Sequence, residues 1–330
     1  METGFIIETL VKVLVVLTVL ASLAAFTTYI ERKVLAFMQR RLGPMNVGPH
    51  GVLQLAADGI KLFTKEDFIP QNAAKPVFMI APIITAATAF IAATAVPFFP
   101  EFELFGYTVR PIISDVNVGV LFVMGVASVG LYGPLLAGMS SANKWSLLGG
   151  ARTAIQLLSY EVVSGLALLA PLMMVGSLSL IDINNYQEGG LSDWIVWSQP
   201  LAFILFVIAG FAETNRTPFD LLEHEAEIVA GYATEYSGMR WGMFFIGEYA
   251  NLFTICFLIS IIFLGGFNDL WFIPGGLAII LKVMFLIFFF LWTRASWPHI
   301  RPDQLMWVCW KILMPLAVIN ILITGFVMMF

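Results

Sequence analysis

Charged residues are scarce in this sequence of 330 residues. They make up 12% of the chain, whereas hydrophobic residues make up 59%, and the mean hydropathy is +0.89. Soluble domains do not have this composition, so we expect lipid to surround most of the chain. The scarcity of charge therefore excludes soluble enzyme classes, and the net charge of −5 gives no reason to expect a nucleic-acid partner.

Cysteine and histidine are also rare. Cys256 and Cys309 both fall in apolar stretches, too far apart to suggest a disulfide framework or a metal cluster, so we expect both in the core. The three histidines, His50, His224 and His299, all lie between apolar runs, so no pair of intramembrane imidazoles is available for a haem. The sequence has no Gly-rich nucleotide motif. We therefore expect this chain to hold no metal and to carry no electrons by itself.

Long apolar runs dominate the remaining sequence. Eight of them have the length that a transmembrane helix needs: 5–28, 77–98, 117–139, 153–177, 194–212, 241–264, 276–293 and 307–330. This pattern predicts an all-α polytopic protein with a single membrane domain over residues 1–330 and both termini on one side of the membrane.

The basic residues between these runs predict the orientation. The odd-numbered connections carry thirteen Lys and Arg residues, whereas Arg110 is the only one on the even-numbered connections. Cytoplasmic loops carry the excess of basic residues in membrane proteins. We therefore expect the odd-numbered connections to face the cytoplasm and both termini to face away from it.

The first connection, residues 31–76, contains an amphipathic segment at 51–65. Gln54, Asp58, Lys61 and Lys65 follow one another at spacings of four, three and four, which places them on one face of a helix. This pattern predicts a helix that lies in the membrane interface. A plain surface anchor is the alternative, but the Gly- and Pro-rich turn at 40–49 favours a helix held against the end of the first span.

The fifth connection, residues 213–240, is unusually acidic. It holds 6 of the 22 acidic residues of the chain: Glu213, Asp220, Glu223, Glu225, Glu227 and Glu235. The sequence Thr-Pro-Phe-Asp at 217–220 resembles the first turn of a helix, with a capping hydroxyl and a proline at the first helical position.

On that predicted helix, Asp220, Glu223 and Glu227 form one stripe. A solvated charged face is the ordinary interpretation of such a stripe. Like charges one turn apart destabilise a helix, however, and crowded carboxylates hold protons near neutral pH. A proton store is therefore a second interpretation.

Two acidic residues fall inside the apolar runs themselves. Glu161 lies in the fourth run and Glu248 about two turns into the sixth. A charge at the centre of a spanning helix costs ~2.5–3.5 kcal/mol, so each carboxyl needs a polar partner, a water-lined cavity or a bound proton. An interhelical hydrogen bond is the purely structural alternative. Lys282 and Lys311 lie nearer to helix ends, where we expect them to snorkel.

Four groups of motifs resemble a known family. The sequences YIERKVLAFMQRRLGP, VGPHGVLQ and ADGIKLFTKED come first, followed by LLSYE, AETNRTPFDLLEHEAEIVAGYATEYSGMR and FFFLWTRASWPHIRPDQLMWVCWK. Together they resemble the H-subunit family of NADH-quinone oxidoreductase, respiratory complex I. They extend over nearly the whole chain in the order of that family.

The resemblance implies a role in quinone access and in coupling quinone reduction to proton translocation. It implies a quinone chamber with these residues along or near it: Glu31, Arg32, Asp58, Lys61, Arg216 and Arg294. It implies a proton path through Glu161, Glu213, Asp220, Glu223, Glu225, Glu227 and Glu248. Quinone is then the substrate, and FMN and the iron-sulfur clusters are expected on partner subunits. The expected location is the inner membrane of a bacterial cell.

Two positions depart from the family pattern. Leu55 stands where a proline is expected, and His299 stands in a loop where arginine and tyrosine are more common. A titratable histidine changes the electrostatics of that loop. Three alternatives remain at this point: a membrane anchor of a membrane-bound hydrogenase, an independent secondary transporter, and a structural adaptor whose acidic residues serve assembly.

Overall fold

The computed structural model describes residues 2–104, 107–109, 111–114, 116–220, 229–270 and 272–329. The described elements are almost all helical. The long helices are α1 (Glu2–Met38), α3 (Lys75–Ala93), α4 (Gly119–Gly130), α5 (Tyr132–Ser140), α6 (Lys144–Val175), α9 (Pro200–Glu213), α11 (Gly238–Phe263), α12 (Gly275–Ser296) and α14 (Met314–Val327).

Shorter elements connect these helices. They are η1 (Pro49–Gly51), α2 (Gln54–Thr64), α7 (Leu180–Asn185), η2 (Leu191–Asp193), α8 (Ile195–Ser198), η3 (Gly231–Ala233), α13 (Pro302–Val308) and the π-helical turn η4 (Cys309–Leu313). The strands β1 (Phe102–Leu104) and β2 (Tyr107–Val109) form one antiparallel hairpin. The predicted all-α membrane architecture is therefore confirmed.

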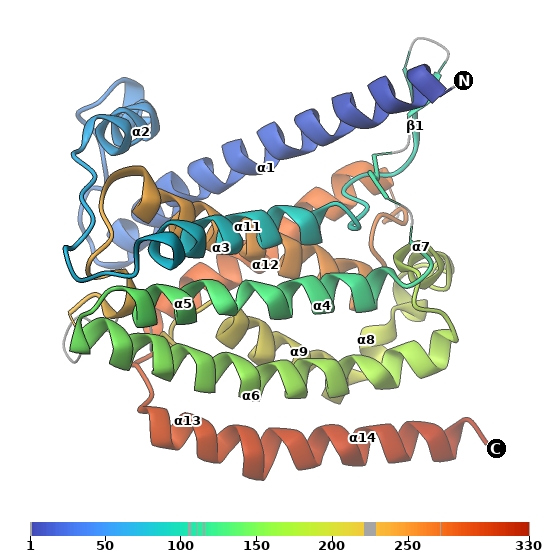
Figure 1. The fold of residues 1–330 in the computed structure, drawn as a ribbon. Helices are drawn as coiled ribbons and strands as arrows, with labels where there is room; N and C mark the ends of the chain where they lie inside the picture. The colour runs from blue at the N-terminus through green and yellow to red at the C-terminus, as the bar shows by residue number, and fades with distance from the viewer. Residues whose placement is uncertain are drawn as a thin grey trace.

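The long helices form a bundle with a common direction (Figure 1). Both termini lie at one end of it, and α2 lies at the other end (Figure 1). Among the described residues, seven helices are long and apolar enough to cross a membrane, with α4 and α5 acting as one and α13 to α14 as another. Termini at one end are what an even number of spans requires, so one further segment must complete the crossing.

That segment is the predicted span at 194–212, which is interrupted. It consists of the one-turn helix α8 and the 14-residue helix α9, separated at Gln199. Pro200 begins α9 and has no backbone N–H to continue α8. The side chain of Gln199 donates to Thr324 at 2.8 Å and accepts from Asn320 at 3.0 Å, so α14 holds the interruption in place.

Helix α11 lies at the centre of the bundle, and residues from Leu252 to Phe263 along it are buried. An α-helix that is apolar on all sides belongs in the interior. Close approach to α3 depends on Gly247, where an added Cβ would lie 3.1 Å from the carbonyl oxygen of Thr85. Cys256 and Cys309 are both buried and free, which confirms their prediction as core residues.

Lys282 corrects one prediction. Its side chain does not snorkel to the surface but is buried, and Nζ donates to the carbonyl of Gly266 at 2.8 Å. The ammonium also lies 4.7 Å from the ring centroid of Trp194. Gly266 follows the carboxyl end of α11, where the helix dipole favours a cation. The dipole and the ring replace the water that snorkelling would have supplied.

Candidate functional site

A chamber of about 490 Å³ opens between α1, α2 and α11. The turn that precedes α11 completes its wall. Its lining residues are Ala24, Ala25, Thr28, Arg32, Leu55, Asp58, Gly59, Lys61, Leu62, Lys65, Ala230, Ala233, Thr234, Tyr236, Ser237, Gly238, Trp241, Phe245, Ile246 and Tyr249. Most of this surface is apolar, and the charged groups come from α1 and α2.

Helix α2 turns its polar face toward this chamber. Asp58 accepts from Arg32 of α1 at 2.7 Å and from Gln54 at 2.9 Å. On the opposite face, Ile60 and Phe63 are exposed. A helix is therefore confirmed within the predicted segment 51–65, over residues 54–64, and its polar residues Asp58 and Lys61 line the chamber.

Glu31 lies behind the chamber with three other residues, and we call the four the Glu31 cluster: Glu31, Arg216 and Tyr249, which are buried, and Arg294, which is partly exposed. Arg216 donates to both carboxylate oxygens of Glu31 at 2.8 Å, and the Tyr249 hydroxyl donates to Glu31 at 2.6 Å. Arg294 also donates to Glu31. Glu31 and Arg216 are each only 3% exposed. Charges this deeply buried are stable only when they are paired and hydrogen-bonded.

Arg216 is a permanent cation in this cluster. Its guanidinium lies over the ring of Tyr249, 4.4 Å from the centroid. Burial lowers the pKa of Arg216, but Tyr249 and the carboxylates of Glu31 and Glu248 outweigh it, so the pKa lies well above its ordinary value. Because Arg216 stays charged, it stabilises a negative charge on neighbouring carboxyl groups.

The local sequence explains how Arg216 reaches this position. Helix α9 ends in a Schellman motif, in which the Arg216 N–H donates to Phe211 O at 2.9 Å and the Asn215 N–H to Ala212 O at 3.3 Å. Asn215 has a φ of 51°, a left-handed conformation that asparagine tolerates better than most residues. The end of α9 is therefore directed back toward α1.

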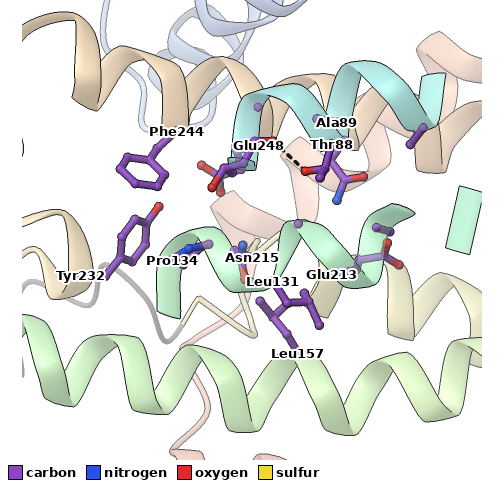
Figure 2. A pocket seen from close by; sticks show the side chains of 16 residues that line it. Thr88, Ala89, Leu131, Pro134, Leu157, Glu213, Asn215, Tyr232, Phe244 and Glu248 are labelled. Atoms are coloured by element: carbon purple, nitrogen blue, oxygen red, sulfur yellow. Dashed lines mark hydrogen bonds between the residues drawn. The ribbon is translucent and has the colours of Figure 1, made fainter. Parts of the chain in front are cut away.

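Two small cavities continue from the Glu31 cluster into the bundle. The first has a volume of about 30 Å³ and is lined by Asn215, Arg216, Asp220, Tyr232, Phe245, Glu248, Tyr249 and Arg294. The second has a volume of about 60 Å³, and its walls include Thr85, Thr88, Glu213, Asn215, Glu248 and Asn251 (Figure 2). Glu248 and Asn215 line both cavities, so the two spaces are neighbours.

Several buried polar atoms near these cavities have no hydrogen-bond partner among the described residues. They include Asn215 Oδ1 and Arg216 Nε, whose residues line the first cavity. A water needs ~10–15 Å³, so the larger cavity has room for roughly four. Glu161 lies close enough to Glu213 to interact with it electrostatically. The two cavities therefore bring polar lining residues from the Glu31 cluster as far as Glu213.

The structure brings together most of the predicted site residues. Arg32, Asp58 and Lys61 line the chamber, whereas Glu31, Arg216 and Arg294 belong to the Glu31 cluster beside it. Asp220, Glu213 and Glu248 line the cavities, and Glu161 interacts electrostatically with Glu213. Glu223, Glu225 and Glu227 lie outside the described residues.

One local prediction within this connection is wrong. Residues 217–220 form a turn and not the first turn of a helix. The carbonyl of Pro218 accepts from Ile300 N–H at 3.2 Å, and that of Phe219 accepts from the Gln156 amide at 2.7 Å. Both hydrogen bonds join this turn to distant parts of the chain, and the rest of the predicted helix, at 221–228, lies outside the described residues.

Tyr249 and Asn215 were not predicted as site residues. Each is the sequence neighbour of a residue that was, since Tyr249 follows Glu248 and Asn215 precedes Arg216. The signal that could have indicated Tyr249 and Asn215 is a polar residue next in sequence to a predicted site residue. Periodicity gives no such indication, because neighbours in a helix point in different directions.

Comparison with known proteins gives one consistent result. The NADH dehydrogenase family model matches residues 11–325. The chain is 74% identical over 328 residues to the NADH-quinone oxidoreductase H subunit of a Nitratiruptor species, with 99% of each chain covered. It is 75% identical over 326 residues to the H subunit from Wolinella succinogenes, again with 99% of each covered. The H subunit from Helicobacter hepaticus is 66% identical over 328 residues, with 99% of each chain covered.

Proposed function

This chain belongs to the H-subunit family of NADH-quinone oxidoreductase, and we propose that its chamber admits the quinone while its cavities link quinone reduction to proton movement. The family resemblance predicted from the motifs is thus confirmed, and the chain is a subunit of an oxidoreductase complex. The hydrogenase anchor and the independent transporter are no longer alternatives.

The size and lining of the chamber support quinone access. Its volume of about 490 Å³ falls within the ~300–1,000 Å³ of small-molecule sites. The apolar side chains from α11 suit an isoprenoid tail, and the Arg32–Asp58 pair at 2.7 Å supplies polar groups near one wall. The exposed Ile60 and Phe63 of α2 suit contact with lipid beside the opening.

One observation carries the coupling proposal: consecutive spaces share lining residues. Tyr249 and Phe245 line both the chamber and the first cavity, and Glu248 lines both cavities. Glu213 borders the second cavity and interacts with Glu161. A change of charge in the chamber therefore reaches Glu161 through adjacent polar groups and spaces that hold water.

Other parts of the reaction belong to other subunits under this proposal. Electrons enter through FMN and iron-sulfur clusters on hydrophilic partner subunits, and the quinone headgroup is reduced there. The membrane-arm subunits receive the proton signal from the Glu161 side. All high-identity relatives named above come from bacteria, which supports a bacterial inner membrane. The basic residues of the odd-numbered connections support an orientation with both termini on the non-cytoplasmic side.

Gly59→Phe is expected to raise KM for a long-tailed quinone by roughly 10-fold, the scale of losing about 1.4 kcal/mol of binding. Gly59 lines the chamber, and a Cβ added there meets no atom within 4 Å. A phenylalanine therefore fills the space without breaking the fold. KM and kcat are measured with the assembled complex in membranes.

Gly59→Ala is the matched control. It adds only one methyl group and removes a glycine from α2, which stabilises a helix by ~0.5–1 kcal/mol. We expect its KM to equal that of the wild type. An unchanged KM in Gly59→Phe, with assembly intact, would contradict quinone passage through this chamber.

A further inference from the structure

Residues 235–240, which we call the clamp, contact three separate parts of the chain. Glu235 begins this set of contacts by accepting from Asn143 Nδ2 at 2.6 Å. Asn143 is also the N-cap of α6, where its side-chain oxygen accepts from Trp145 N–H at 3.0 Å. One asparagine therefore attaches the clamp to the beginning of α6.

Tyr236 attaches the clamp to α3. Its ring stacks on Phe78 with centroids 4.0 Å apart, and its hydroxyl donates to Phe78 O at 3.1 Å. Burial raises the pKa of Tyr236 to about 12, so the hydroxyl keeps its proton and remains a donor. Phe78 is 0% exposed, so this contact fixes the clamp against the protein interior.

The remaining residues attach the clamp to the segment that follows α2. The Ser237 hydroxyl donates to Glu66 O at 3.2 Å, and Arg240 pairs with Asp67 at 3.0 Å. Gly238 has a φ of +57°, and a Cβ there would lie 3.2 Å from the carbonyl oxygen of Lys65. The chain needs glycine at this position for both reasons.

Helix α2 depends on such ties because it has no buried residue of its own. Near its beginning, the Tyr29 hydroxyl donates to His50 O at 2.8 Å, and Asp58 pairs with Arg32 at 2.7 Å. Toward its end, the clamp supplies the polar contacts. The position of α2, and with it the separation of α2 from α11, is therefore set by polar ties at both ends.

We propose that the clamp sets the width of the chamber by positioning α2, and so determines how well the chamber accepts a long-tailed quinone. This inference rests on the proposed quinone chamber. Tyr236, Ser237 and Gly238 line the same space, so a shift of the clamp moves one wall directly and α2 indirectly. Arg240 and Asp67 do not line the chamber in the described structure, and they act as positioning residues.

The test compares Arg240→Gln and Asp67→Asn with Arg240→Lys in the assembled complex. KM and kcat are measured with a long-tailed quinone and with a short-tailed analogue. Each charge-removing variant is expected to raise KM for the long-tailed quinone by up to roughly 5-fold, the range for a partly exposed ion pair. Arg240→Lys keeps the charge, so its KM is expected to match the wild type.

A merely structural role would lower activity equally with both quinones, and this result would overturn the proposal. Equal KM values in wild type and charge-removing variants would overturn it as well. Asp67→Asn, which removes the same ion pair from its other side and does not change the chamber lining, provides the same comparison if Arg240→Gln does not assemble. Gly59→Phe separates the two proposals. If Gly59→Phe raises KM for the long-tailed quinone and the clamp variants do not, quinone access through the chamber is supported and the proposed role of the clamp is wrong.

Discussion

Replacing Glu31 with glutamine is expected to reduce the amount of assembled complex strongly and to lower quinone reductase activity by roughly 10-fold or more. Glu31 is the carboxylate that pairs with both Arg216 and Arg294 and accepts from Tyr249. Without it, the buried Arg216 loses its hydrogen-bonded counter-ion. Breaking a buried pair from one side costs ~3–5 kcal/mol, a large part of the ~5–15 kcal/mol that stabilises a typical domain.

Asp58→Asn is the matched control for this prediction. It also removes a carboxylate from an ion pair, and the Arg32–Asp58 distance of 2.7 Å is close to the Arg216–Glu31 distance of 2.8 Å. The Arg32 and Asp58 side chains, however, are 48% and 32% exposed. Such pairs contribute ~0–1 kcal/mol, so assembly is expected to remain close to the wild-type level. Assembly is measured on native gels, and activity is expressed per assembled complex. Equal assembly of both variants would show that the Glu31 cluster does not stabilise this subunit.

Glu161→Gln and Glu213→Gln are expected to leave the complex assembled while lowering turnover and proton pumping by roughly 10-fold or more. Glutamine keeps the volume and much of the hydrogen-bonding capacity of glutamate but cannot release a proton. A positioned acid or base contributes ~10²–10⁴-fold to a proton-transfer step. Both activities are measured in vesicles after assembly has been confirmed.

The two positions are expected to differ in degree. Glu213 borders the cavity of about 60 Å³, where water is able to replace part of the lost carboxyl. Glu161 does not line that cavity and lies within the long helix α6, so it is expected to be the more sensitive. Partial recovery in Glu161→Asp would indicate that titration is required, because aspartate keeps the carboxyl at a shorter reach.

Glu188→Gln serves as the control for the two glutamine variants. Glu188 is an exposed carboxylate that lines neither cavity, so its replacement is expected to leave turnover and pumping unchanged. Wild-type pumping in both Glu161→Gln and Glu213→Gln would exclude these residues from the proton path. The adaptor role, in which the acidic residues serve only assembly, would then be the better explanation.

The sequence by itself determined the membrane class, the helical architecture and the amphipathic character of α2. These features depend on the length and period of local patterns, which the apolar runs and the spacing of Gln54, Asp58 and Lys61 display directly. The motifs also identified the family, because their order and content extend over nearly the whole chain. Local patterns were sufficient for all of this.

Only the tertiary structure decided which of these residues meet. Glu31 is separated by 185 residues from Arg216 and by 263 from Arg294, and no period relates such distant positions. The direction of the polar face of α2 likewise depends on its ties to Arg32 and to the clamp. Residues 217–220 form a turn because Gln156 and Ile300, from distant helices and loops, supply their hydrogen bonds. Partners supplied by packing outweighed local propensity at each of these places, since a buried polar group must be satisfied wherever its partner lies in the chain.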